Sequence, residues 1–157
     1  MLVGNLLLAI AWAVLQANVT LANLLAGYIL GYLILLLLAK GGLLPESRYI
    51  GKVGMALRLG AFFLRELVIA NFRLARDVVS SNGAVRPGII KVPLDATRDS
   101  EILLLAAMIN LTPGSVALDV SPDRKFLYVH SMYVDTADAA RAEIKNGYER
   151  RILDLMR

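Results

Sequence analysis

An uncharged stretch over residues 1–39 dominates the hydrophobic pattern of the chain. Residues 2–15 are apolar apart from Asn5, polar side chains gather around residues 16–23, and residues 24–39 are apolar again. As one straight helix this stretch would be about 58 Å long, roughly twice the thickness of a bilayer's hydrocarbon core. The pattern therefore predicts an N-terminal transmembrane helical hairpin over residues 1–40, with spans near residues 2–17 and 21–39.

A cleavable signal peptide is the alternative explanation for the first span. Signal peptides begin with a Lys- or Arg-bearing region, whereas residues 1–15 contain neither residue type. A second apolar span also follows at once, which a secreted protein would not need. The hairpin is therefore the preferred interpretation.

The second span carries two glycines, Gly27 and Gly31, four residues apart on one helix face. Such small residues let another helix approach closely, which matters because lipid supplies no hydrophobic force between helices. An amide such as Asn5 needs a hydrogen-bond partner in hydrocarbon. We expect these three residues to form a helix-packing or partner interface. A chance spacing is the alternative for the glycines, because glycine is common in membrane helices.

Beyond a linker over residues 41–51, residues 52–80 have the pattern of an amphipathic helix. At about 100° per residue, the arginines gather on one side and large apolar residues on the other. We expect this helix to lie on the cytoplasmic membrane surface. The alternative is a third span whose charges face protein. Charges near the middle of a lipid-exposed span would be costly, which favours the surface position. The predicted basic face consists of Arg58, Arg65, Arg73 and Arg76.

The charge distribution sets the expected orientation. Residues 40–79 hold seven Lys and Arg against three Asp and Glu, a net +4, whereas residues 80–157 hold ten of each. Positive charge beside an apolar span marks the cytoplasmic side. A nucleic-acid-binding protein would instead spread a basic face over its folded domain. The pattern therefore predicts a cytoplasmic C-terminal region that does not bind nucleic acid.

The last part of the chain, residues 85–157, has the pattern of a small α+β domain with the order βαββα. The strand that follows the first helix of this domain is preceded by a turn over Thr112, Pro113 and Gly114, in which glycine suits the position that needs a positive φ. We expect the elements near residues 88–93, 98–110, 115–120, 126–134 and 136–156.

Composition argues against an enzyme. The chain has no Cys, so disulfides, Cys-ligated metals and thiol nucleophiles are excluded. With one His, His130, triads and His-cluster metal sites lack parts, while a carboxylate-only site stays open. We find no pattern for a catalytic residue, a cofactor or a metal. Glu66 is a candidate for an ion path, because a carboxylate near membrane depth can relay protons or hold a cation. A structural ion pair with a neighbouring arginine is the alternative.

Several short motifs resemble those of the E subunits of multisubunit Mrp-type cation (Na+ or K+)/proton antiporters. The resemblance covers essentially the whole chain, and its most specific part is LTPG followed by a Leu-Asp strand, a turn and Tyr-Val-His. Ser115 stands where Thr is expected. The motifs are Asn5-Leu6-Leu7, Trp12, GYILG over 27–31, ELVIAN over 66–71, RPGI over 86–89, LTPGS over 111–115, LDVSPD over 118–123 and LYVHSM over 127–132.

The resemblance implies an accessory component of a complex that exchanges sodium or potassium for protons across the bacterial inner membrane. The ion path in such complexes belongs to the large subunits, so this chain would serve assembly or stability. Its partners would be the other subunits and the lipid bilayer. Two other functions stay open: a membrane-anchored cytoplasmic binding or regulatory module, and direct ion transfer through Glu66.

Overall fold

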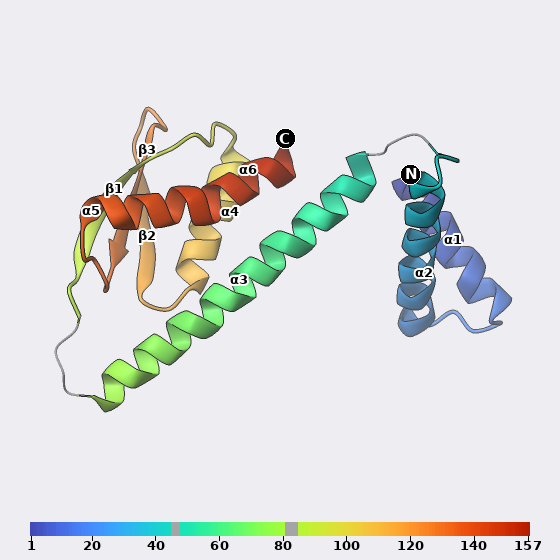
Figure 1. The fold of residues 1–157 in the computed structure, drawn as a ribbon, viewed down its shortest axis with the longest axis horizontal. Coiled ribbons are helices and arrows are strands. Elements are labelled where there is room, and N and C mark those ends of the chain that lie inside the picture. The colour runs from blue at the N-terminus through green and yellow to red at the C-terminus, as the bar shows by residue number, and fades with distance from the viewer. Residues whose placement is uncertain (45–47, 81–84) are drawn as a thin grey trace. The chain divides into compact units, whose positions relative to one another are not determined.

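The computed structural model describes residues 1–44, 48–80 and 85–157, and it divides the chain into two compact units, Met1–Gly54 and Met55–Arg157. The first unit contains the helices α1 (Leu2–Leu15) and α2 (Leu21–Lys40), which lie against each other (Figure 1). Helix α2 begins where the Thr20 side chain accepts a hydrogen bond from the backbone N–H of Asn23. In the described part of the chain, α2 alone is long and apolar enough to cross a membrane, and α1 is a shorter apolar helix.

A single long helix, α3 (Arg48–Val79), follows. It begins four residues before the expected start at residue 52, so the predicted linker over residues 41–51 is too long. The glycine-rich run favours a linker by local propensity, but the Tyr49 side chain packs onto α1 and α2. Tertiary contacts of this kind override weak local preferences. The middle of the predicted linker, residues 45–47, lies outside the described residues.

The second unit contains residues 55–79 of α3 and a three-stranded antiparallel sheet. The strands β1 (Gly88–Pro93), β2 (Ser115–Val120) and β3 (Phe126–Ser131) pair in the order β1-β3-β2. Strand β3 is three residues shorter than expected, and β2 contains a register shift between Ala117 and Asp119. The predicted βαββα order is present in this unit.

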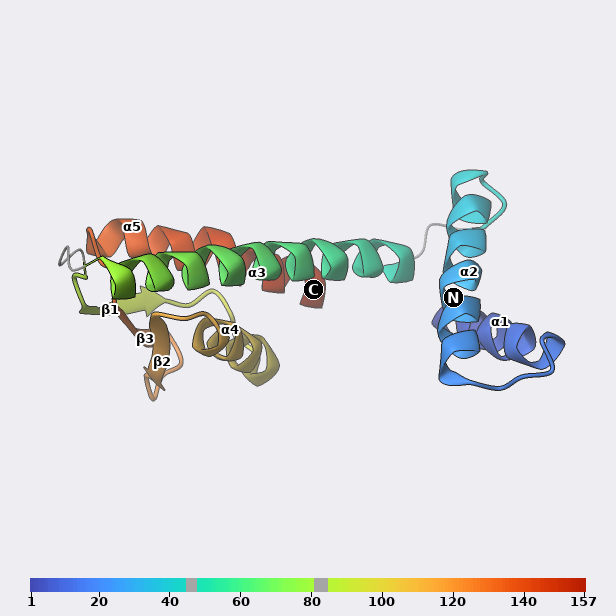
Figure 2. The same cartoon turned by 90° about the horizontal axis from the view of Figure 1, so that it is seen from below.

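Helix α4 (Asp99–Leu111) connects β1 to β2, and a helical run closes the chain. That run consists of α5 (Ala137–Ala142), a π-helical segment η1 (Glu143–Glu149) and α6 (Arg150–Met156), where the sequence predicted one regular helix. Figure 1 shows α3 slanting relative to this last helix, and Figure 2 shows the same elements from below. The two meet where the Phe62 and Tyr148 rings lie edge to face, with centroids 5.2 Å apart. The N-cap of α4 is Arg98, and the Glu101 carboxylate accepts from the backbone N–H groups of Thr97 and Arg98.

The hydrophobic core of the second unit lies between one face of the sheet and the helices. Strands β1 and β3 contribute alternate residues to this core, as expected for a sheet covered on one face. Leu59 brings α3 to the same core. The other buried members are Ile90, Val92, Leu105, Met108, Ile109, Leu127, Val129, Ala140, Ile144, Tyr148 and Ile152.

Candidate functional site

The two glycines of α2 lie against α1. A Cβ at Gly27 would come within 2.7 Å of the Trp12 Cβ and 2.9 Å of the Ala9 carbonyl oxygen. A Cβ at Gly31 would collide with the Asn5 Oδ1 and reach 3.0 Å from the Leu8 Cβ. The structure therefore brings the glycines and Asn5 together in one close helix contact within the chain.

Asn5 also links the hairpin to the first turn of α3. Its Nδ2 donates a hydrogen bond of 2.8 Å to the Tyr49 hydroxyl, which lies 2.6 Å from the Tyr28 hydroxyl. The Tyr49 and Tyr32 rings meet edge to face, with centroids 6.1 Å apart. Asn5 is fully buried, so this hydrogen bond removes much of the cost of placing an amide among apolar side chains.

Helix α3 has two unlike faces. The face that carries Glu66 and Arg73 packs toward the sheet and the last helix, where both side chains line a cavity. At about 100° per residue, Leu57 lies about 180° from Glu66, and this opposite side carries an exposed apolar stripe. The stripe consists of Leu57, Leu64, Val68, Phe72 and Val79, which are 67%, 61%, 51%, 74% and 87% exposed.

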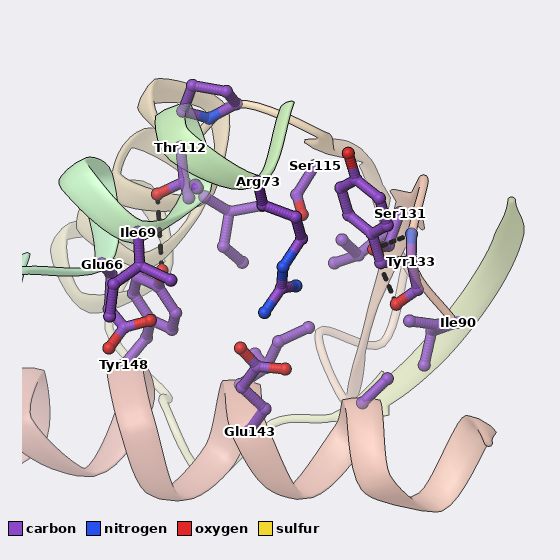
Figure 3. Close-up of a pocket in the computed structure, with 16 residues that line it drawn as sticks. Glu66, Ile69, Arg73, Ile90, Thr112, Ser115, Ser131, Tyr133, Glu143 and Tyr148 are labelled. Carbon is purple, nitrogen blue, oxygen red and sulfur yellow. Dashed lines mark hydrogen bonds between the residues drawn. The ribbon is translucent and has the colours of Figure 1, made fainter. Parts of the chain in front are cut away.

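The cavity between α3, the sheet and the last helix has a volume of about 80 Å³. Figure 3 shows the Arg73 guanidinium pointing into it toward Glu143, with Glu66 beside Tyr148. The Arg73 guanidinium also lies 5.2 Å from the centre of the Tyr133 ring. Two carboxylates and one guanidinium thus share a small space that is large enough for a few water molecules.

The Glu66 carboxylate accepts a hydrogen bond of 2.8 Å from Arg65, and its side chain is 17% exposed. Arg76 similarly lies 3.6 Å from Asp77. The predicted basic face is therefore divided. Arg65 and Arg76 pair with acidic neighbours, Arg73 enters the cavity, and Arg58 lines a separate groove. In the described residues, no three His, Cys, Asp or Glu side chains come together in a way that could hold a metal ion.

Two tyrosines of the cavity stay protonated more firmly than a free tyrosine. Burial raises the pKa of the Tyr148 hydroxyl, its contact with Thr112 lowers it in part, and the nearby Glu66 and Glu143 raise it further. The neighbouring Asp77 carboxylate and burial raise the pKa of Tyr133. Both hydroxyls are therefore neutral hydrogen-bonding groups at physiological pH.

The predicted turn forms one wall of this cavity. Gly114 has φ +91°, the left-handed region that glycine adopts at least cost. The Thr112 hydroxyl donates to the Met108 carbonyl at 2.9 Å and lies 3.4 Å from the Tyr148 hydroxyl. A Cβ at Gly114 would come within 3.1 Å of the Tyr133 ring. The turn thus fixes the distance between α4 and the end of β3.

Two buried carboxylates hold the loop between β1 and α4. Glu149 accepts from the backbone N–H groups of Asp95 at 2.6 Å and Ala96 at 2.8 Å, and it pairs with Lys145 at 3.0 Å. Burial raises the pKa of Glu101, but the backbone N–H groups of Thr97 and Arg98 and the Arg157 guanidinium lower it by more, so its net pKa is lowered. These contacts serve the stability of the second unit.

Sequence reasoning missed the partners that complete these clusters. Tyr49, Glu143 and Tyr148 reach their sites only through tertiary packing, and each lies in a segment with no local motif. Residue type was the one signal that could have identified these partners, because tyrosine and glutamate on the apolar side of a helix usually need a hydrogen-bond partner.

Comparisons with known proteins agree on one family. Residues 5–155 match the family model MNHE, described as Na+/H+ ion antiporter subunit. The chain is 33% identical over 151 residues to the E subunit of the Na(+)/H(+) antiporter of Alkalihalophilus pseudofirmus, covering 96% of this chain and 94% of that protein. It is also 33% identical over 153 residues to the E subunit of the Na(+)/H(+) antiporter of Bacillus subtilis, covering 98% and 96%.

Two solved structures share the fold. A chain of the Mrp complex from a Dietzia species matches with a TM-score of 0.51 at 24% identity, covering 65% of this chain and 94% of that chain. A chain of the membrane-bound sulfane sulfur reductase, an archaeal respiratory membrane complex, matches with a TM-score of 0.57 at 23% identity, covering 96% and 95%.

Proposed function

This chain belongs to the family of Na+/H+ antiporter E subunits, and from that membership we propose that it stabilises the assembly of a multisubunit cation/proton antiporter without carrying the ion path. The observation that carries this proposal is the apolar stripe of α3. Five large apolar side chains are exposed on the side of the helix opposite its own domain. A surface of this kind is typical of a contact with a membrane or another protein.

The topology that fits this proposal has both helices of the hairpin in the membrane. Helix α2 has 20 residues, about 30 Å, which matches the hydrocarbon thickness. Helix α1 has 14 residues, about 21 Å, and would be short for a span unless the bilayer thins or neighbouring helices cover its ends. The net +4 over residues 40–79 favours a cytoplasmic second unit.

In this topology α3 lies on the cytoplasmic membrane surface with its apolar stripe toward lipid or neighbouring subunits. Its charged residues would cost several kcal/mol each at the centre of a lipid-exposed span. Glu66 faces the cavity of the second unit, about 180° from Leu57 of the stripe. This position favours a structural ion pair with Arg65 over a place in a transmembrane ion path.

The test compares two double substitutions in the host membrane. Leu64→Ser/Phe72→Ser removes the middle of the stripe, and Leu103→Ser/Leu111→Ser is the matched control, because it changes two exposed apolar residues with the same spacing in α4. The amount of assembled complex and the cation-dependent proton exchange in vesicles are measured together.

We expect the stripe variant to lower the amount of complex and the exchange in parallel, so that exchange per assembled complex stays constant. The control should change neither quantity. An intact complex that has lost exchange would contradict the proposal and move the ion path into this chain.

A further inference from the structure

The groove that Arg58 lines is separate from the cavity. It lies between the last helix and the beginning of residues 55–79 of α3. Its volume is about 430 Å³. Three arginines reach it from two elements, with one carboxylate opposing them, so its net charge is about +2. The lining residues are Met55, Arg58, Leu59, Asn146, Arg150, Arg151 and Asp154.

One of these arginines is held firmly in place. The Arg151 Nη1 donates hydrogen bonds to the carbonyl oxygens of Asn146 at 2.9 Å and Gly147 at 2.7 Å. Its guanidinium stacks over the Phe62 ring, 4.1 Å from the centroid. Because this side chain is already ordered, little conformational entropy is lost when it meets a ligand.

The other two arginines remain available to a ligand. In the described part of the chain, neither Arg58 nor Arg150 forms an ion pair, although Asp154 lines the same groove. Guanidinium groups bind phosphate oxygens with paired hydrogen bonds. The groove therefore suits an anion that bears a phosphate group.

The apolar part of the groove selects among such anions. Met55 and Leu59 line the groove beside the arginines, and at about 100° per residue Arg58 lies between the stripe of α3 and its domain-facing side. If α3 lies on the membrane as proposed above, Arg58 lies at the side of the helix, near the depth of the lipid headgroups, where basic clusters bind anionic lipids. We propose that this groove binds the phosphate headgroup of an anionic phospholipid.

The experiment uses the full chain in detergent and counts retained lipids by native mass spectrometry, with phosphatidylglycerol and phosphatidylcholine offered separately. The variant Arg58→Gln/Arg150→Gln removes two of the groove arginines. The control Arg86→Gln/Lys125→Gln removes two exposed cations that do not line the groove. All these proteins keep the hairpin, so lipid bound there cancels in the comparison.

We expect the wild-type chain and the control to prefer phosphatidylglycerol, and the groove variant to bind it roughly 25-fold more weakly, because each arginine near an anionic surface contributes about five-fold in affinity. Unchanged phosphatidylglycerol binding by the groove variant would overturn the proposal. Displacement of the lipid by excess inorganic phosphate would also overturn it in favour of free phosphate.

This inference rests on the proposed membrane-surface position of α3, yet its failure can be told apart from a failure of the assembly role. Complex formation is measured in the same groove variant. A complex that assembles normally while phosphatidylglycerol binding is lost supports the lipid site on its own. Loss of assembly with lipid binding retained overturns the lipid site without affecting the assembly role.

Discussion

Substitution of Gly27 by alanine gives the sharpest test of the hairpin. The added Cβ would lie 2.7 Å from the Trp12 Cβ and 2.9 Å from the Ala9 carbonyl oxygen. Carbon atoms in ordinary contact are about 3.5–4.0 Å apart, so α1 and α2 would have to separate by roughly 1 Å. One of the two obstacles is backbone, which cannot rotate away as a flexible side chain can.

The expected cost follows from two opposing effects. Overpacking costs about 1–3 kcal/mol, and replacing a helical glycine by alanine returns about 0.5–1 kcal/mol. We therefore expect Gly27→Ala to destabilise the hairpin by about 1–2 kcal/mol. Gly4→Ala is the matched control, because a Cβ at Gly4 meets nothing within 4 Å and keeps only the favourable effect.

The assay uses the single tryptophan of the chain, Trp12, which lies beside Gly27. The full chain in mixed micelles is unfolded with increasing SDS while tryptophan fluorescence is recorded. Gly27→Ala should unfold at a lower SDS fraction than wild type, and Gly4→Ala at the same or a higher one. Equal midpoints for the two variants would refute the close-contact argument.

Three further predictions address other clusters. Tyr49→Phe removes the hydroxyl that accepts from buried Asn5, and it should lower the free energy of unfolding by about 1–3 kcal/mol in the same SDS titration. The lowered pKa of Glu101 stabilises the fold at pH values above the pKa of a glutamate in the unfolded chain, about 4.3. This contribution disappears as the pH falls through the lowered pKa of the folded state. In thermal denaturation, the difference in stability between wild type and Glu101→Gln should therefore shrink on acidification. Glu66→Gln should leave exchange per assembled complex unchanged in vesicles, because Glu66 faces the second unit.

The regular elements of the second unit could be predicted because their signals are local. Strand β1 occupies the predicted residues 88–93, and the turn at Gly114 has the expected positive φ. Alternating apolar residues and a Pro-Gly turn depend on neighbours within a few positions. The π-helical segment over residues 143–149 has no comparable local signal.

The contacts that organise the candidate sites could not be predicted in the same way. Asn5 meets Tyr49 across 44 positions of the chain, and Glu66 meets Tyr148 only because α3 packs against the last helix. The sequence pattern placed Glu66 and Arg73 correctly on one side of a helix. It gave no partner for that side, and the structure turns Glu66 and Arg73 toward the domain, where carboxylates and hydroxyl groups lie around the guanidinium.

The two unlike faces of α3 suggest why a membrane or partner subunits would stabilise the chain. Complete burial of one large apolar side chain contributes about 1.5–3 kcal/mol, so covering even half of the exposed stripe would contribute on the order of 5 kcal/mol. Small domains are stable by only about 5–15 kcal/mol. The domain already covers the charged side of α3, so covering the apolar side would add a stabilisation comparable with that of the whole domain. Under the proposed assembly role, a protein built in this way would be stabilised by its assembly and would stabilise that assembly in return.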